Sequence, residues 1–357
     1  MEIKVGILTA PHIEYEQREN TFVLKNVRIG IGFHWDRYED QEFQGTLEIK
    51  PNPDGTETAI NTIDLEDYLC SVISSEMSAD SPMELLKAHA VISRSWAIRA
   101  MQKPNHEGFH VCADDHCQRY EGLRRMSERA VEAVRATAGQ VLMYGDEICD
   151  CRYYKCCGGK TEVWRTCWED IDVPYIQSVE CPYCNPKHIK ALSSHGERSF
   201  DFLLSTCLND YDQETTDFHD WKVTYTADEL SEIIRTKSGI DFGQITDLIP
   251  LQRGASGRIY ALKIVGTKRT EIIGKELKIR LWLSKTCLYS SWFDVEKSFS
   301  SPARGGREGL FHLTGHGWGH GAGLCQIGAA QMAAEGHSYE EILHFYYHGT
   351  RLGAAAQ

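Results

Sequence analysis

The strongest hydrophobic pattern in the chain begins at Asp64 and predicts two buried helices. After Asp64, a residue suited to a helix N-cap, apolar side chains recur at three- and four-residue steps, and this stripe ends in the carboxylate of Glu76. A second helix is expected to start soon after, with Ser81 as N-cap, Pro82 at the first helical position and Glu84 closing a capping box. Few positions in this second segment are polar, so we expect the two helices to pack against each other.

The segments on either side of these helices predict shorter strands and helices. Residues 1–63 carry alternating stretches at 3–8, 22–33 and 45–51, and a turn at 52–55, which predicts a small β unit packed on the helices. After the two helices, the pattern predicts a helix at 127–137 and a hairpin from residue 141. A capped helix should run from Thr226 and Glu229 to Gly239, followed by two strands and a helix within 256–283. A small-residue helix should start near Ala322, and Ser338 and Glu341 should cap a last helix.

This order predicts an α+β fold with a two-helix core, small β units around it and a mixed α/β insertion. The expected divisions are a β unit at 1–63, a core with a His/Cys loop at 64–193, an α/β scaffold insertion at 194–299, and a Gly/His-rich loop with C-terminal helices at 300–357 that completes the core.

Composition and charge narrow the class of protein. The 357 residues are 42% hydrophobic and 25% charged, which is typical of a globular protein. The net charge of −13 and the lack of a basic stripe argue against a nucleic-acid partner. We expect no transmembrane segment, because no apolar run reaches the length of about 18 residues that a span needs. The N-terminal residues also lack the basic start and apolar core of a signal peptide.

The thirteen cysteines are grouped, which favours metal binding or reduced thiols over an even disulfide framework. One group lies in the loop after residue 101, which has two cysteines and three histidines within twelve residues: His106, His110, Cys112, His116 and Cys117. Two thiolates with two imidazoles can close a tetrahedral zinc shell. The alternative is a disulfide between the two cysteines, with the histidines exposed.

A second group of cysteines contains Cys149, Cys151, Cys156, Cys157, Cys167, Cys181 and Cys184. The Cys181-x-x-Cys184 pair has two interpretations. It is redox active in a thioredoxin-like βαβ unit, but no such pattern surrounds it. Otherwise it forms a second metal site with Cys149, Cys151 or His188.

Glu76 is the candidate catalytic residue. A glutamate at a buried joint between helices loses hydration, and this loss raises its pKa and lets it hold a proton as a general acid. The alternative is a structural carboxylate that reaches solvent or pairs with Arg94 or Arg99.

Two other stretches are candidates for binding. In the glycine-rich stretch 313–350, His316, Trp318 and His320 alternate with glycines and could present imidazoles and N–H groups to a ligand, although the Lys-Ser/Thr ending of a phosphate loop is absent. The aromatic residues of the segment that follows the Gly158-Gly159 pair suit either sugar faces or core packing: Trp164, Trp168 and Tyr175.

These stretches together resemble a known family. EDYLCSVISSEM followed by PMELLKAHAVISRSWAIR is similar to the core of the stage II sporulation protein D family of peptidoglycan lytic transglycosylases, whose relatives include amidase enhancers. The GHGWGHGAG stretch, followed by Gln326 and Gly-Ala, resembles the C-terminal signature of that family. The aromatic and Gly-Gly segment near residue 158 is similar as well, but Cys156 and Cys157 replace the usual serine. The resemblance covers about residues 45–350.

The resemblance implies a chemistry and a set of site residues. Glu76 occupies the position of the catalytic acid, which protonates the glycosidic oxygen between N-acetylmuramic acid and N-acetylglucosamine and then takes a proton from the 6-hydroxyl, giving 1,6-anhydro ends. Some family members hold zinc in the same loop, and the matching order here is His106, Cys112, His116 and Cys117, with His110 as a spare; four protein ligands make such an ion structural. The candidates for substrate binding, chosen for polarity within matching motifs, are Arg94, Tyr154, Lys160, His320 and Gln326.

The resemblance also suggests partners and a location. Peptidoglycan glycan strands are the expected partner, and a cell-wall amidase is a candidate second one. The cell envelope or periplasm is expected, with the cytoplasm as the alternative because no signal peptide is visible. Two other functions remain open: a non-catalytic glycan-binding amidase enhancer, and a cytoplasmic metal- or redox-sensing protein.

Overall fold

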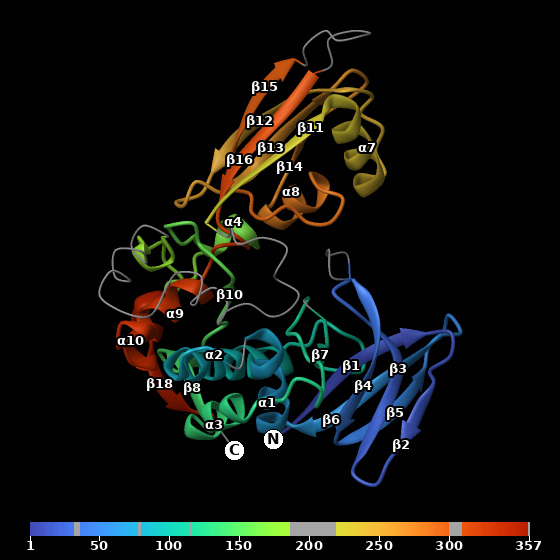
Figure 1. The fold of residues 1–357 in the computed structure, drawn as a ribbon, viewed down its shortest axis with the longest axis vertical. Coiled ribbons are helices and arrows are strands. Elements are labelled where there is room, and N and C mark those ends of the chain that lie inside the picture. The colour runs from blue at the N-terminus through green and yellow to red at the C-terminus, as the bar shows by residue number, and fades with distance from the viewer. Residues whose placement is uncertain (32–35, 78–79, 115, 186–218, 300–308, 356–357) are drawn as a thin grey trace.

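The structure is a computed structural model that describes residues 1–31, 36–77, 80–114, 116–185, 219–299 and 309–355. Within these ranges the chain has the predicted α+β fold and two hydrophobic cores (Figure 1). The larger core joins buried side chains of residues 3–184 to those of residues 322–347. The smaller core lies within residues 221–313. A larger unit is therefore interrupted by an inserted unit, which lies at the top of Figure 1.

Short strands build the N-terminal part of the larger unit: β1 (Glu2–Ala10), β2 (Tyr15–Gln17), β3 (Thr21–Ile29), β4 (Arg37–Gln44), β5 (Thr46–Pro51), β6 (Glu57–Asp64) and β7 (Val111–Cys112). One sheet has the order β5-β6-β1-β7 and another the order β2-β3-β4. The β unit shares its core with the helices, because the ring of Tyr120 packs 5.5 Å from Phe43 of β4 and 5.0 Å from Tyr68 of the first helix.

The predicted helix pair forms the centre of the larger unit. Helix α1 (Leu65–Glu76) is followed by α2 (Met83–Gln102), and α3 (Glu128–Ala136) packs against both. The predicted N-cap is confirmed, since the Asp64 side chain accepts a hydrogen bond from the backbone N–H of Glu66.

The predicted capping box before the second helix is wrong. Helix α2 starts at Met83, and its N-cap Pro82 has no side chain that can accept a hydrogen bond. The Glu84 carboxylate instead accepts hydrogen bonds from the Lys87 ammonium at 2.7 Å and from the backbone N–H of Tyr339 at 2.8 Å. A tertiary contact thus replaces the local one.

The rest of the larger unit comprises β8 (Gln140–Tyr144), β9 (Glu147–Ile148), β10 (Tyr153–Tyr154), α4 (Trp164–Cys167), the 3₁₀ turn η1 (Pro182–Cys184), β17 (Leu324–Cys325), α9 (Gln326–Ala334), α10 (Tyr339–Tyr346) and β18 (Arg351–Ala354). The predicted hairpin is confirmed for β8 and β9, but β10 leaves it and pairs in parallel with β17. Helix α9 starts at Gln326, four residues later than expected, and the capping box of Ser338 and Glu341 is confirmed.

The inserted unit comprises β11 (Asp220–Thr226), α7 (Ala227–Ser238), β12 (Ile245–Arg253), β13 (Ile259–Gly266), β14 (Thr270–Ile273), α8 (Glu276–Trp282), β15 (Phe293–Phe299) and β16 (Gly309–His316). The predicted box of Thr226 and Glu229 and the stop at Gly239 are confirmed. Strand β16 pairs with both β11 and β15, so this unit continues to His316, beyond the predicted boundary at 299.

Buried charged side chains join the two units. The carboxylate of Glu162 accepts hydrogen bonds from the backbone N–H groups of Ala255 and Ser256 and from the Ser256 hydroxyl, at 2.6–3.0 Å. The guanidinium of Arg258 donates to the backbone oxygens of Gly319 and Cys157 at 3.2–3.3 Å. The inserted unit is therefore fixed to the glycine-rich loop and to the segment after β10.

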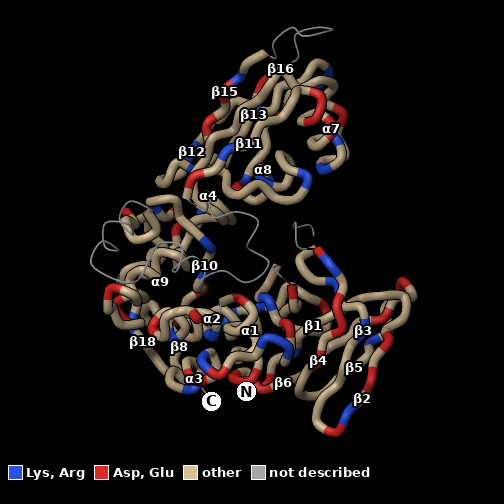
Figure 2. The backbone as a smooth tube through the Cα atoms, viewed as in Figure 1, with Lys and Arg blue, Asp and Glu red and all other residues tan. Residues whose placement is uncertain are grey.

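Basic and acidic residues are interspersed over both units (Figure 2). Among the residues that the structure describes, no helix has both the length and the apolar character that a bilayer span requires.

Candidate functional site

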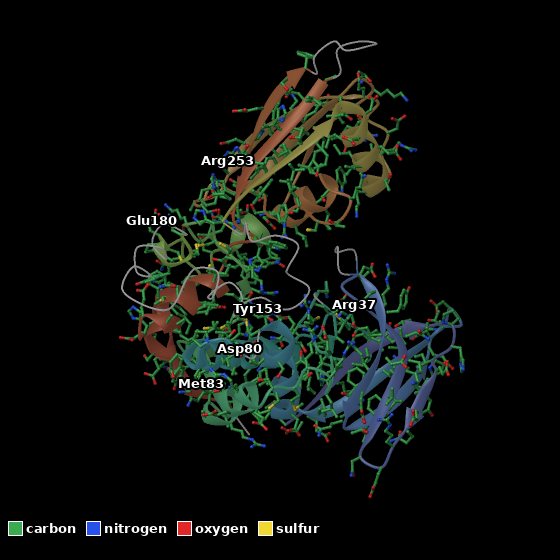
Figure 3. The ribbon with its side chains drawn as sticks, in the orientation of Figure 1. Arg37, Asp80, Met83, Tyr153, Glu180 and Arg253 are labelled. Carbon is green, nitrogen blue, oxygen red and sulfur yellow. The ribbon has the colours of Figure 1, made fainter. Side chains whose placement is uncertain are left out.

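Glu76 lies at the last position of α1, where the apolar stripe ends. Its side chain is half-buried, and Oε1 accepts hydrogen bonds from the backbone N–H of Arg119 at 3.0 Å and from the hydroxyl of Tyr153 at 3.1 Å. Tyr153, labelled in Figure 3, comes from β10 and is half-buried. The two arginines considered as alternative partners contact other acids, Arg94 pairing with Glu66 and Arg99 with Glu147.

The phenols near Glu76 remain protonated. Burial raises the pKa of Tyr153 well above its usual value, and the nearby charge of Glu76 raises it further. Burial likewise raises the pKa of Tyr68, whose hydroxyl donates to the Gln118 side chain at 3.1 Å. A neutral Tyr153 can therefore act as a hydrogen-bond donor to Glu76 over the whole physiological pH range.

A buried histidine of α2 supports the ring of Tyr153. The rings of His89 and Tyr153 meet edge to face with centroids 4.4 Å apart. The two ring nitrogens of His89 lie 3.1 Å from the Ser93 hydroxyl and 3.1 Å from the amide nitrogen of Gln326. Burial lowers the pKa of His89 to about 3, so this histidine is neutral near pH 7.

His320 of the glycine-rich loop holds the backbone of the same tyrosine. Its Nε2 lies 3.0 Å from the backbone oxygen of Tyr153, and its Nδ1 accepts from the backbone N–H of Ala322 at 3.1 Å. Because a carbonyl oxygen can only accept, the proton of this imidazole is on Nε2. Burial lowers the pKa of His320 well below its usual value, which agrees with a neutral ring.

The residues predicted to bind substrate differ in their burial and in the groups that they contact. Gln326 is buried and His320 is half-buried; His320 contacts the backbone of Tyr153, and Gln326 contacts His89. Lys160 is half-buried and forms an ion pair at 2.8 Å with Glu180, which is labelled in Figure 3.

The predicted binding roles of Arg94 and Tyr154 are not supported. The guanidinium of Arg94 is fully buried, makes two hydrogen bonds of 2.7 Å to Glu66 and donates to the backbone oxygen of Gln140, so it stabilises the helix core. The hydroxyl of Tyr154 points the other way from that of Tyr153, toward the backbone oxygen of Gly323 at 3.4 Å. Successive side chains of a strand face opposite sides, which explains why the neighbouring tyrosine contacts Glu76.

The aromatic residues considered for sugar binding pack together. The rings of Trp164 and Trp168 lie 4.4 Å apart, and the guanidinium of Arg152 lies over both. Trp168 also contacts His320, with centroids 4.8 Å apart. This cluster supports the loop that carries His320.

The predicted metal ligands converge. The ligand atoms of His106, Cys112, His116 and Cys117 all lie within 4.8 Å of one another. Cys117 Sγ is 3.3 Å from His106 Nε2 and 3.5 Å from His116 Nδ1. The other sulfur, of Cys112, is 3.8 Å from His116 Nδ1, and both cysteines are free thiols. In a tetrahedral zinc site, bond lengths near 2.3 Å to sulfur and 2.0–2.1 Å to nitrogen separate these atoms by about 3.5 Å, so the donor set fits such an ion.

The metal loop is attached both to the β sheet and to Glu76. His110, the spare candidate, accepts from the backbone N–H of Lys4 at 2.9 Å and so fastens the loop to β1. Cys112 lies in β7, paired with β1. Two residues after Cys117, the backbone N–H of Arg119 meets Glu76. The loop therefore sets the position of one of the donors to the Glu76 carboxyl group.

A group of two histidines and one aspartate lies on the inserted unit. Asp220 contacts His316 Nδ1 at 2.6 Å with one carboxylate oxygen and His219 Nδ1 at 2.9 Å with the other. The Asp220 side chain is exposed, and exposed acidic groups of this kind commonly occur without a metal.

Tyr153 and His89 are not among the site residues predicted from the sequence. A histidine within the apolar run of α2 is a usable signal for His89, because burial of such a side chain requires polar partners. No local signal separates Tyr153 from Tyr154, since the choice depends on the pairing of β10 with β17.

Comparison with known proteins relates the chain to a family. A family model described as stage II sporulation protein matches residues 53–144, and one described as a domain of unknown function (DUF8618) matches residues 162–323. The first match contains both helices of the Glu76 site, and the second contains most of the inserted unit.

Curated relatives match over most of the chain. An uncharacterized protein of Brachyspira hyodysenteriae is 30% identical over 94% of this chain and 80% of its own length. Stage II sporulation protein D of Bacillus subtilis is 24% identical over 83% of this chain and 76% of its own length. The amidase enhancer of Bacillus subtilis is 26% identical over 80% of this chain but only 40% of its own length. On these matches the chain belongs to the stage II sporulation protein D family.

Proposed function

We propose that this protein is a lytic transglycosylase of peptidoglycan. Its family relation supports a role in cell-wall metabolism, and the proposal adds that it cleaves the bond between N-acetylmuramic acid and N-acetylglucosamine to leave 1,6-anhydro ends. The observation that carries the proposal is the half-buried carboxyl group of Glu76, whose Oε1 is held by two hydrogen-bond donors. The cell envelope is the location that this activity requires.

Glu76 acts as both acid and base in this scheme. Hydrolytic glycosidases generally use two carboxyl groups, one to protonate the leaving oxygen and one as nucleophile or activator of water. In a lytic transglycosylase the 6-hydroxyl of the substrate is the nucleophile, so one carboxyl group suffices. Glu76 gives its proton to the glycosidic oxygen, and the resulting carboxylate takes a proton from the 6-hydroxyl as that oxygen attacks C1. The proton count balances over the cycle.

The donors to Oε1 orient this chemistry. Because a backbone N–H can only donate, the contact from Arg119 favours the acidic proton on the other oxygen, Oε2. Tyr153 donates to the same Oε1, and its own position is fixed by His89 on its ring and by His320 on its backbone. After proton transfer both donors stabilise the carboxylate, as hydrogen bonds to a charged acceptor are the strong ones.

We also propose that His106, Cys112, His116 and Cys117 hold a structural zinc ion. The ion cross-links a loop that has little apolar packing of its own. Four protein ligands leave no open position, so substrate chemistry takes place at Glu76. The contribution of the loop to activity is the placement of the Arg119 N–H.

The alternative function is a glycan-binding protein that stimulates a cell-wall amidase without cleaving glycan. The similarity to an amidase enhancer favours this reading. The two functions differ in one observable, the formation of anhydro ends.

The test is digestion of purified glycan strands, with the products examined by mass spectrometry. We expect wild-type protein to release fragments with 1,6-anhydro ends and Glu76→Gln to release none above background. Glu128→Gln is the matched control, since Glu128 is exposed in the first turn of α3; it should retain wild-type activity. Glycan binding without anhydro products from the wild type would refute the enzyme and support the amidase enhancer.

A further inference from the structure

Four cysteine sulfurs meet in the interior of the larger unit, away from the His/Cys loop. Cys157 follows β10, Cys181 and Cys184 flank and end the η1 turn, and Cys325 lies in β17. Their sulfur atoms all lie within 4.8 Å of one another, and those of Cys157 and Cys184 are 3.2 Å apart. Each of the four residues is at most 1% exposed.

We propose that Cys157, Cys181, Cys184 and Cys325 bind a single zinc ion as a structural tetrathiolate site. A tetrahedral ion with Zn–S bonds near 2.3 Å places its sulfurs about 3.8 Å apart. The observed cluster has this size. In a [4Fe–4S] cluster each cysteine thiolate binds a separate iron atom, which places the cysteine sulfurs further apart, so the four sulfurs seen here fit a mononuclear ion better.

Hydrogen-bond donors surround the sulfurs, as a set of thiolates requires. Cys325 Sγ accepts from the backbone N–H groups of Cys157 at 3.2 Å and of Gly328 at 3.4 Å, at the start of α9. Cys157 Sγ accepts from the backbone N–H of Gly159 at 3.4 Å. Sulfur is a weak acceptor as a thiol and a stronger one as a thiolate, so these N–H groups stabilise the metal-bound form.

Tyr346 completes this environment. Its hydroxyl lies 3.3 Å from Cys181 Sγ and donates when that sulfur is a thiolate. There is no room for a side chain at Gly328, because a Cβ there would lie 2.3 Å from the Tyr346 oxygen and 2.9 Å from Cys181 Sγ. A residue larger than glycine at this position would displace a proposed ligand.

Disulfide bonds are the main alternative, and Cys157 with Cys184 is one pair that could form such a bond, since their sulfurs are 3.2 Å apart. Two disulfides do not require four sulfurs within one coordination sphere. The two-residue spacing between Cys181 and Cys184 is typical of zinc ligands that lie on one turn. A redox role of this pair is disfavoured by its complete burial, since reactive cysteines are partly exposed.

The ion would hold together the segment after β10, the η1 turn and β17. Cys157 follows the strand that carries Tyr153, and Cys325 immediately precedes Gln326, the partner of His89. The backbone oxygen of Cys157 also accepts from Arg258 of the inserted unit. The metal assignment stands on the sulfur geometry and does not depend on the proposed transglycosylase activity.

The test is metal analysis of the full chain, purified under reducing conditions without added metal. We expect about two zinc ions per chain, and about one in Cys157→Ser and in Cys181→Ser. Cys70→Ser is the matched control, because Cys70 is a buried cysteine of α1 that belongs to neither proposed metal group; it should keep about two. Cys117→Ser should lose only the ion of the His/Cys loop. Unchanged zinc in both Cys157→Ser and Cys181→Ser would overturn the assignment.

A measurement on the wild type covers the case in which a variant fails to fold. X-ray absorption at the zinc edge averages over both sites and should give about three sulfur and one nitrogen ligands per zinc, since an S₂N₂ site is averaged with an S₄ site. A mean of about two sulfurs and two nitrogens would leave only the loop site and refute the proposal. Disulfides between these cysteines, found by mass spectrometry of unreduced protein, would refute it as well.

Discussion

Replacing Tyr153 by phenylalanine tests the proposed site most directly. The substitution removes one of the two hydrogen bonds to Glu76 Oε1, the one of 3.1 Å from the Tyr153 hydroxyl, and leaves the bond from Arg119 in place. The aromatic ring remains, so its edge-to-face contact with His89 is preserved. The change therefore isolates a single donor.

The expected loss of activity follows from the value of that donor. A hydrogen bond to a charged group contributes about 1.5–3 kcal/mol. With about 1.4 kcal/mol for each factor of ten in rate, kcat/KM for anhydro product should fall about 10- to 100-fold. Because the lost donor favours the carboxylate over the acid, the decline of activity at high pH should also move to higher pH in Tyr153→Phe.

The adjacent tyrosine provides the control. The Tyr154 hydroxyl makes a long contact of 3.4 Å to the backbone oxygen of Gly323, on the other side of the strand. Tyr154→Phe should therefore keep kcat/KM within about threefold of the wild type, since a weak neutral hydrogen bond contributes at most about 1 kcal/mol. The assay is the initial rate of release of anhydro-terminated fragments, measured at several pH values. Equal losses in the two variants, or full activity in Tyr153→Phe, would refute the assigned geometry.

Other predictions concern stability and metal. The pKa of about 3 for His89 lies below its value of about 6.5 in an unfolded chain, so between these pH values the unfolded state binds a proton that the native state does not. The stability contributed by the neutral ring is therefore complete above pH 6.5. It falls by about 1.4 kcal/mol per pH unit as the pH drops toward 3. His89→Gln should remove about 2 kcal/mol of the difference in unfolding free energy between pH 6.5 and pH 5, measured with urea, and an unchanged difference would contradict a neutral buried imidazole. Arg94→Met should cost about 2–4 kcal/mol, because it breaks the buried pair with Glu66, while activity per folded molecule stays within about twofold; a selective loss of activity would restore its predicted binding role. Cys117→Ser should lose the loop zinc and reduce activity, because the Arg119 donor is no longer fixed. Metal analysis and the glycan assay measure the two effects. Full activity after loss of the ion would show that the loop does not position a donor that Glu76 needs.

The parts of the fold that depend on local contacts could be predicted from the sequence. The cap at Asp64 and the box of Thr226 with Glu229 are formed within one helical turn, and the metal loop gathers its four ligands within twelve residues. The box expected at Ser81 failed because Glu84 contacts Tyr339, far away in the chain. Local signals are reliable only where no distant residue competes for the same group.

Two of the missed features, the contact of Tyr153 with Glu76 and the four-cysteine cluster, depend on the parallel pairing of β10 with β17. That pairing decides that Tyr153, and not Tyr154, contacts Glu76, and it brings Cys325 to Cys157. A two-residue strand has too short a pattern to be recognised in a sequence, and its partner lies beyond the entire inserted unit. The motif around Gln326 indicated a site residue, but its role behind His89 required the three-dimensional structure.

The position of β17 after the inserted unit has a consequence for biosynthesis. Glu76 leaves the ribosome early, whereas Cys325 and Gln326 emerge only after the inserted unit has been translated. Domains generally fold in the order in which they are made, so the nascent chain would carry its acid without the segment that steadies Tyr153. The proposed activity therefore has to wait until the residues that follow the inserted unit have been made.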